Sequence, residues 1–168
     1  NYNRYLGDGS NIDKSVPVQV GSDTDWTYVY RSTWNAAALK SDDTAWVWGN
    51  GFSGLKGDGT TVPGNASLPV QISGTWNLVV CDSTSYFGIK TDNTLWSWGG
   101  NNSYGVLGQG DTISRSSMTQ IGSDTWSSVD ADGGFVVGIK TNGLKFAWGR
   151  NDFGQLGDGT TRNRSAPV

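Results

Sequence analysis

Histidine is absent from this 168-residue sequence, and cysteine and methionine occur once each. Without histidine there can be no Cys/His zinc site and no histidine acid–base catalysis, and the usual base for a serine nucleophile is missing. The single Cys81 cannot form an internal disulfide, and its place in an apolar strand favours a buried side chain over a nucleophile. We therefore expect a protein that is not an enzyme and has no catalytic residue, cofactor or metal site.

Long apolar runs and clusters of positive charge are also missing. The longest apolar runs, such as residues 45–48 and 78–81, have four residues, whereas a membrane-spanning helix needs roughly 20. The net charge is −3, from 12 basic and 15 acidic residues spread along the chain. No basic stripe is therefore available to neutralise a phosphate backbone. We expect neither membrane insertion nor binding to nucleic acid.

Glycine and aromatic residues are abundant instead. The chain has 25 glycines, nine Trp, six Tyr and five Phe, although only 35% of its residues are hydrophobic. Glycine supports tight turns, and large flat side chains must supply much of the packing. This combination predicts an all-β fold with short strands and many turns.

Three sequence markers share a period of 50 residues. They are a Trp-Gly pair at Trp48, Trp98 and Trp148, a second tryptophan at Trp26, Trp76 and Trp126, and a lysine at Lys40, Lys90 and Lys140. A period of roughly 40 to 50 residues is typical of four-stranded propeller blades. The sequence therefore predicts a β-propeller with a circularly offset first repeat at 1–49, further repeats at 50–99 and 100–149, and the start of a fourth at 150–168.

Each repeat contains the pattern of a β-hairpin. Residues 37–40, 87–90 and 137–140 predict short strands, which are followed by turns and by return strands at 45–49, 95–99 and 145–149. Alternation along each return strand places its two aromatic residues on one face. We expect this face to be buried between neighbouring blades.

A glycine-rich loop and, in most copies, a proline-bearing strand complete the repeat. Gly-Asp-Gly turns contain Asp8, Asp58 and Asp158. One carboxylate per loop is too few for calcium, which needs six to eight oxygen ligands, so we expect these aspartates to form turns. The strands that follow lie at 15–20, 67–72 and 116–121, and proline in the first two predicts edge strands.

These motifs, clearest at residues 41–48, 58–70 and 151–168, resemble the regulator of chromosome condensation repeat. The low charge and the Ser-Asp-Thr-x-Trp style of residues 22–26 and 123–126 look like bacterial and phage versions of that repeat. The histidine that the family usually carries ahead of the Ala-Leu-Lys strand is missing from all three copies. We interpret that histidine as structural, and its loss argues against a nuclear member of the family.

The resemblance implies a ring of about seven blades, whereas 168 residues hold only about 3.4 periods of 50. An open stack of blades would leave strand edges and aromatic faces in water. We therefore expect either that the sequence is a segment of a longer chain, as its start within a repeat and without an initiator Met also indicates, or that copies complete one another in an oligomer.

Residues that vary between the repeats are candidates for a partner surface, because loops can change without harming the blades. The candidates are Arg31, Trp34, Tyr86, Phe87, Tyr104 and Phe135. We expect a non-enzymatic scaffold for protein–protein interaction or assembly, in an extracellular or virion setting, whose partner is another protein or further blades of the same propeller.

Three alternative functions remain open from the sequence. The first is a carbohydrate-binding propeller with glycan partners, although Asn35, Ser85 and Phe135 at equivalent positions argue against identical sites in every blade. The second is guanine-nucleotide exchange, and the third is enzyme inhibition, both of which the resemblance to the repeat family implies.

Overall fold

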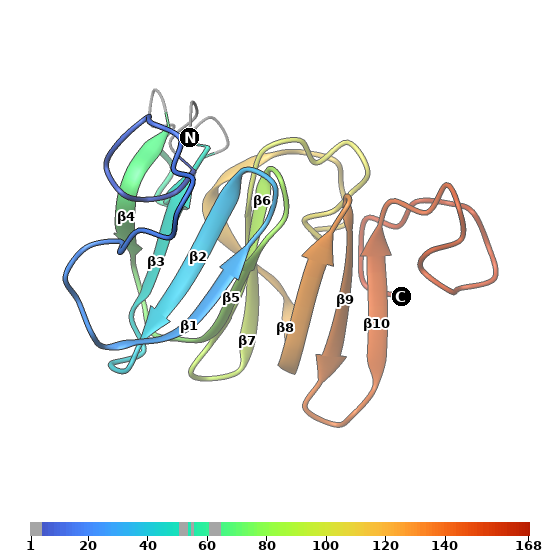
Figure 1. The fold of residues 1–168 in the computed structure, drawn as a ribbon. Helices are drawn as coiled ribbons and strands as arrows, with labels where there is room; N and C mark the ends of the chain where they lie inside the picture. Colours follow the sequence, from blue (N-terminus) through green and yellow to red (C-terminus); the bar gives the residue numbers. More distant parts are fainter. Residues whose placement is uncertain (1–4, 51–53, 55, 61–64) are drawn as a thin grey trace.

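The computed structural model describes residues 5–50, 54, 56–60 and 65–168 (Figure 1). Within these residues the chain forms β-strands and no helix, which confirms the predicted all-β class. No helix in this part of the chain is long and apolar enough to cross a membrane. The strands are β1 (Trp26–Arg31), β2 (Asn35–Lys40), β3 (Ala45–Gly49), β4 (Ala66–Ile72), β5 (Trp76–Cys81), β6 (Ser85–Lys90), β7 (Thr94–Gly99), β8 (Arg115–Asp132), β9 (Phe135–Lys140) and β10 (Lys145–Gly149).

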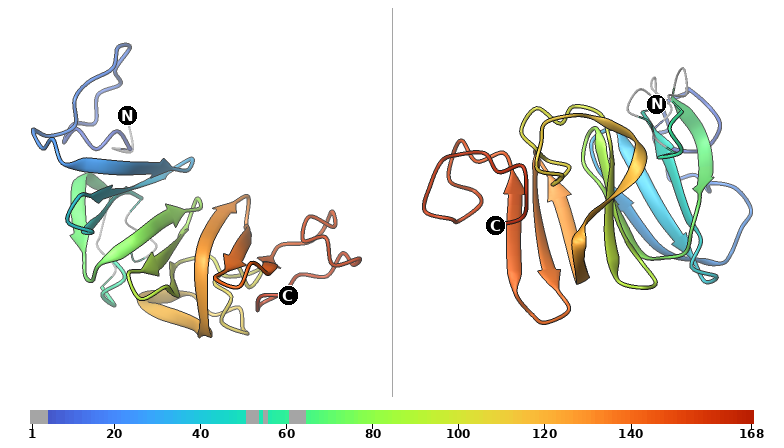
Figure 2. Two further views of the ribbon diagram at one scale, coloured as in Figure 1. Left: turned by 90° about the horizontal axis from the view of Figure 1, so that it is seen from below. Right: turned by 180° about the vertical axis from the view of Figure 1, so that it is seen from behind.

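The strands make three antiparallel blades that follow one another around an arc (Figure 2). Blade 1 is the four-stranded sheet β1-β2-β3-β4. The other two blades share the long strand β8, whose first part pairs with β7 and whose second part pairs with β9. Blade 2 is therefore β5-β6-β7 with the start of β8, and blade 3 is the end of β8 with β9 and β10. These blades confirm the predicted incomplete propeller.

The fourth strand of each blade comes from the following sequence repeat. In blade 1, Gly49 of β3 pairs with Ala66 of β4, which lies beyond the Trp-Gly marker. In blade 3 the equivalent Gly149 bonds to Arg164, and Val168 bonds to Ala147 at 3.0 Å in both directions. The sheets are therefore offset from the sequence period, and the first one runs from β1 to the end of β4.

The predicted hairpins between the second and third strands are present in all three blades. Asp42 and Asp92 accept hydrogen bonds from the backbone N–H groups of Thr44 and Thr94, each at 3.0 Å. The turn also needs a positive φ, which is +63° at Asp43, +66° at Asn93 and +84° at Gly143. Short polar residues and glycine tolerate this left-handed conformation best.

The hydrophobic core lies between the blades. One cluster joins Ala37, Leu39 and Val47 of blade 1 to Trp76, Val79 and Trp98 of blade 2, and another joins Val80, Phe87, Ile89 and Leu95 of blade 2 to Trp126, Val129, Val136 and Trp148 of blade 3. The aromatic pairs of the return strands β7 and β10 thus face the preceding blade, and the alternation places each pair on one face as predicted. The periodic lysines lie over these rings; the Nζ atom of Lys90, for example, is 3.8 Å from the ring centre of Trp96.

Candidate functional site

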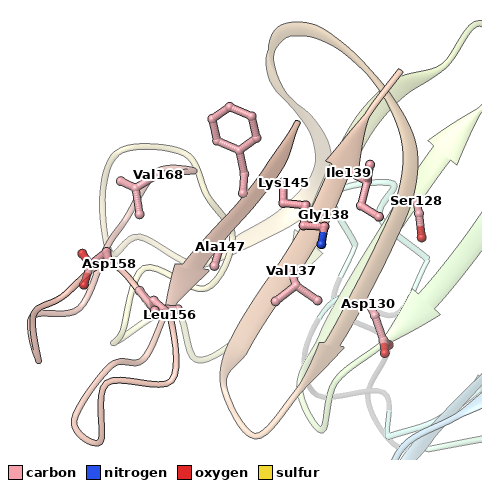
Figure 3. Close-up of a pocket in the computed structure, with 12 residues that line it drawn as sticks. Ser128, Asp130, Val137, Gly138, Ile139, Lys145, Ala147, Leu156, Asp158 and Val168 are labelled. Atoms are coloured by element: carbon pink, nitrogen blue, oxygen red, sulfur yellow. The ribbon is translucent and has the colours of Figure 1, made fainter. Parts of the chain in front are cut away.

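Each blade has an N-side face, turned toward the preceding blade, and a C-side face, turned toward the following one. The C-side face of blade 3 is open and contains a pocket of about 480 Å³ (Figure 3). Its lining includes the apolar residues Val137, Ile139, Ala147, Leu156 and Val168 and the polar residues Ser128, Asp130, Lys145 and Asp158. This face is the strongest candidate for an assembly interface.

Comparison with blade 2 explains why this face is exposed. Phe87 and Ile89 lie 50 residues before Val137 and Ile139 and are completely covered by blade 3, at 0% and 1% exposure. Val137 and Ile139 are 43% and 36% exposed. Equivalent positions are thus covered by a following blade in blade 2 and exposed to solvent in blade 3.

The N-side face of blade 1 is open at β1, whereas Trp48 of β3 is 8% exposed and donates from Nε1 to the Tyr5 carbonyl at 3.2 Å. Val29 is 67% exposed, whereas its equivalents Val79 and Val129 are buried at 0% and 3%. Trp26 and Trp48 line a pocket of about 490 Å³ on this face. The structure contains two interfaces between blades, each made of one C-side face and one N-side face. The two ends of the arc expose one face of each kind.

Two of the predicted partner residues are in the core. Tyr86 and Phe87 are both 0% exposed. Tyr86 stacks on Trp98 at a ring distance of 5.5 Å, and Phe87 lies edge-on to Trp148 at 6.5 Å. Both side chains fill space between blades, so the prediction that they form part of an accessible partner surface does not fit the structure.

The other four predicted residues remain accessible but do not form one patch. Arg31 lies on the open N-side face of blade 1, at the register of Cys81 and Ala131. Phe135 is half-buried at the start of β9. Trp34 and Tyr104, in contrast, are brought together although 70 positions separate them in the sequence, because both line a groove across the turns of the blades.

This groove has a volume of about 230 Å³. Its lining comes from the turn between the first two strands of each blade and from the loop after β7. The residues are Trp34 from blade 1, Asp82, Ser83 and Thr84 from blade 2, Gly133 and Gly134 from blade 3, and Asn101, Tyr104 and Val106 from the loop. All three blades thus contribute, and we call it the turn groove.

Hydrogen bonds between blades hold the turn groove in shape. Asn35 Nδ2 donates to the backbone carbonyls of Asp82 and Ser83 at 3.1 and 2.9 Å. The hydroxyl of Ser32 also donates to the Asp82 carbonyl, at 3.1 Å. On the other side the Gly134 N–H donates to the Asp82 carboxylate at 3.2 Å. The turn of blade 2 is therefore tied to both neighbouring blades.

Tyr104 is held by the loops around it. The Arg150 guanidinium carbon lies 5.2 Å from the centre of the Tyr104 ring, and the same side chain bonds to Asp152 at 2.7 Å. A Cβ atom on Gly134 would lie 3.5 Å from the ring, so the ring packs against the turn of blade 3. Phe153 occupies the register of Tyr104 one repeat later and is 84% exposed, because no further blade follows it here.

Sequence reasoning did not find Ser83, Thr84 and Asn101 as groove residues. Each belongs to a residue type that is common in turns, and nothing in the sequence spacing distinguishes them. Only the arrangement of blades around the arc brings them beside Trp34 and Tyr104.

The described residues contain no group of three His, Cys, Asp or Glu side chains that could hold a metal ion. The aspartates of the glycine loops form turns, as predicted: Asp58 and Asp158 accept the N–H groups of Thr60 and Thr160 at 2.9 Å. Burial raises the pKa of the Cys81 thiol to about 12. Because the thiolate is the nucleophilic form, a thiol that stays protonated is inert.

Comparison with protein families identifies one repeat directly. Residues 142–168 match the family model of the regulator of chromosome condensation (RCC1) repeat. Among curated protein sequences, none matches the chain.

Solved structures resemble the whole arc. Human WBSCR16 matches 99% of this chain with a TM-score of 0.88 and 19% identity. Yeast RCC1 (Prp20) bound to Kap60 matches 86% with a TM-score of 0.73 and 16% identity. A second structure of Prp20p from Saccharomyces cerevisiae, whose description names binding to Gsp1p and histones, matches 86% with a TM-score of 0.72 and 16% identity.

The chain covers 46%, 36% and 38% of these three structures, which is less than half of each. At these identities the likeness establishes the fold, a propeller of the RCC1 type. Together with the match at residues 142–168, it confirms the repeat family that the sequence motifs predict.

Proposed function

We propose that this chain, an arc of RCC1-type propeller blades, is a non-enzymatic scaffold that acts through protein–protein interaction and assembly. The observation that carries the proposal is the pair of open blade faces. Val29 on one end of the arc and Val137 on the other are exposed at registers that are buried between blades elsewhere in the chain.

A further blade of the same repeat would fit these faces. Exposed apolar surface that is contiguous and large is unusual on soluble proteins and marks interaction sites. The C-side face of blade 3 also carries Asp130 and Lys145 where blade 2 has the buried Val80 and Leu95. A partner for this face should therefore offer polar groups at those two registers, which makes the contact selective.

Solved propellers of the same fold support a protein-binding role. The yeast protein Prp20 has been solved with Kap60 bound, and its description names Gsp1p and histones as further partners. Guanine-nucleotide exchange and enzyme inhibition, the two alternative functions implied by the repeat family, would also act through contact with a protein partner. The low charge and the polar surface favour an extracellular or virion setting and a bacterial or phage source.

Native mass spectrometry of the native protein tests the assembly proposal. We expect a particle with more blades than this chain supplies, from a longer polypeptide or from further copies. Val137→Asp on the open face should then lower the thermal stability or the assembled fraction of that particle. Leu144→Asp is the matched control, because Leu144 is 58% exposed and lies in a hairpin turn.

A native particle with the 17.9 kDa mass of this chain alone would contradict the proposal. Equal behaviour of Val137→Asp and Leu144→Asp would also contradict it, because the C-side face would then have no more importance than an exposed turn.

A further inference from the structure

The turn groove lies on a different surface from the open blade faces. Its residues come from three consecutive blades that are all present, so its shape does not depend on what covers the ends of the arc. We propose that the turn groove binds a short neutral carbohydrate through Trp34 and the polar groups beside it.

Trp34 offers a flat apolar surface in a fixed position. Its side chain is 41% exposed, whereas the next residue, Asn35, is 3% exposed and tied to blade 2 through Asp82. A pyranose ring has one face made mainly of C–H groups. Stacking that face on an indole removes apolar surface from water on both partners.

Unused hydrogen-bonding groups lie close to this platform. The hydroxyls of Ser83 and Thr84 and the Nδ2 group of Asn101 line the groove and make no hydrogen bond with any residue that the structure describes. Hydroxyl groups both donate and accept, and an amide nitrogen donates. Sugar hydroxyls also donate and accept hydrogen bonds, so they can pair with the hydroxyls of Ser83 and Thr84 and with the amide of Asn101.

The charged side chains around the groove already have hydrogen-bonding partners. Asp82 is 5% exposed, and its two carboxylate oxygens accept the N–H groups of Ser83 and Gly134. Arg150 is paired with Asp152. A charged ligand that paired with either side chain would disturb bonds that hold the groove in shape, whereas a neutral ligand leaves those bonds intact.

The groove is small and partly open. Its volume of about 230 Å³ is below the usual range for small-molecule sites, about 300 to 1,000 Å³. A Cβ atom at Gly133 would meet nothing within 4 Å, so the blade 3 side leaves room for a ligand to continue. These dimensions favour a single sugar ring inside the groove, with the further rings of a longer glycan extending out of it.

Binding to an array of immobilised neutral oligosaccharides, built from glucose, mannose, xylose and N-acetylglucosamine, tests the proposal with the native protein. We expect retention of the protein by at least one class. Calorimetry with that saccharide should show that Trp34→Ala weakens binding about tenfold or more, roughly the change produced by 1.4 kcal/mol. Phe153→Ala is the matched control, since Phe153 is an exposed aromatic residue outside the groove.

A second variant guards against a folding defect in Trp34→Ala. Thr84→Val keeps the size and shape of the side chain and removes only the hydroxyl, so binding should weaken several-fold while the circular dichroism spectrum is unchanged.

Three results would overturn the proposal. They are no binding to any neutral saccharide at millimolar concentration, an equal loss in Trp34→Ala and Phe153→Ala, and Trp34-dependent binding to a peptide library in place of the saccharides. The last would assign the groove to a protein partner. Because the array needs no change in assembly, a failure here is distinct from a failure of the scaffold proposal, which the native mass decides.

Discussion

Asn35 in blade 1 fixes the backbone of Asp82 in blade 2. Its Nδ2 group donates to the carbonyls of Asp82 and Ser83, and its Oδ1 atom accepts the N–H of Asn50 at 3.0 Å. With 3% exposure, this one side chain satisfies three backbone groups in a buried place. It joins two blades and supports the turn groove at the same time.

Replacing Asn35 with Ala should therefore destabilise the protein strongly. The Asp82 carbonyl keeps the bond from the Ser32 hydroxyl and the Asn50 N–H keeps its bond to the Trp34 carbonyl, so the Ser83 carbonyl is the group that loses the bond described here. A polar group that loses its partner costs about 1 to 3 kcal/mol, so we expect the free energy of unfolding to fall by about 2 kcal/mol. Urea denaturation measures the change. Asn77→Ala is the control, because Asn77 is exposed and its Nδ2 group bonds at 3.3 Å; equal losses in the two variants would contradict this role of Asn35.

Tyr86→Phe should leave stability unchanged or raise it. The Tyr86 hydroxyl is buried and has no hydrogen-bond partner among the described residues. Phenylalanine keeps the stack on Trp98 and removes a buried polar group whose desolvation costs about 1 to 3 kcal/mol. We expect an increase of about 1 kcal/mol in the free energy of unfolding, measured by urea denaturation.

Tyr28→Phe is the control for that substitution, because Tyr28 is 38% exposed and should be neutral. A clear loss of stability in Tyr86→Phe would mean that its hydroxyl has a bonding partner in solution.

Asp43→Gly should stabilise the first hairpin. Asp43 has a φ of +63°, a conformation that glycine already supplies at the equivalent Gly143. A residue with a side chain destabilises the folded state by roughly 1 kcal/mol when it adopts the left-handed conformation. Glycine removes this strain, but it also raises the conformational entropy of the unfolded chain, which offsets part of the gain. We expect a net gain of about 0.5 kcal/mol in thermal unfolding.

The same change at Asn93 should gain less. Asparagine tolerates positive φ better than most residues, and the Oδ1 atom of Asn93 accepts a hydrogen bond from Asn77. A larger gain at Asn93 than at Asp43 would contradict the conformational explanation.

Stability should fall in acid below about pH 4. Hydrogen bonds from Thr160 and Arg164 lower the pKa of Asp158 from its ordinary value of 3.8 to about 2. Hydrogen bonds from the Thr44 and Thr94 side chains likewise lower the pKa values of Asp42 and Asp92. Because each pKa is lower in the folded state, the stabilisation is complete above the unfolded value and is lost as pH falls toward the folded value.

We therefore expect the melting temperature to be nearly constant from pH 7 to pH 5 and to decrease between about pH 4 and pH 2. Asp158→Asn should make this decrease shallower. A melting temperature that rises on acidification, or an unchanged slope in Asp158→Asn, would contradict the assignment.

Local sequence determined the regular part of this protein. The tryptophans at the 50-residue period, the alternation in the return strands and the Asp-Thr turns predict the hairpins, the blade and the buried rings, because each depends on residues close together in the chain. For this reason Trp98 and Trp148, which are buried at the predicted interfaces, could be placed correctly from the sequence alone.

The tertiary structure decided which variable residues are accessible. Tyr86 and Trp34 both depart from the repeat, yet Tyr86 is closed in between blades 1 and 2 while Trp34 faces the groove. Likewise, Phe87 is buried and its equivalent Val137 is open only because a third blade covers one and no fourth blade covers the other. Burial at these positions depends on the neighbouring blade, which is formed by residues about 50 positions away in the sequence. The pattern within a single repeat therefore cannot predict which of these side chains are buried.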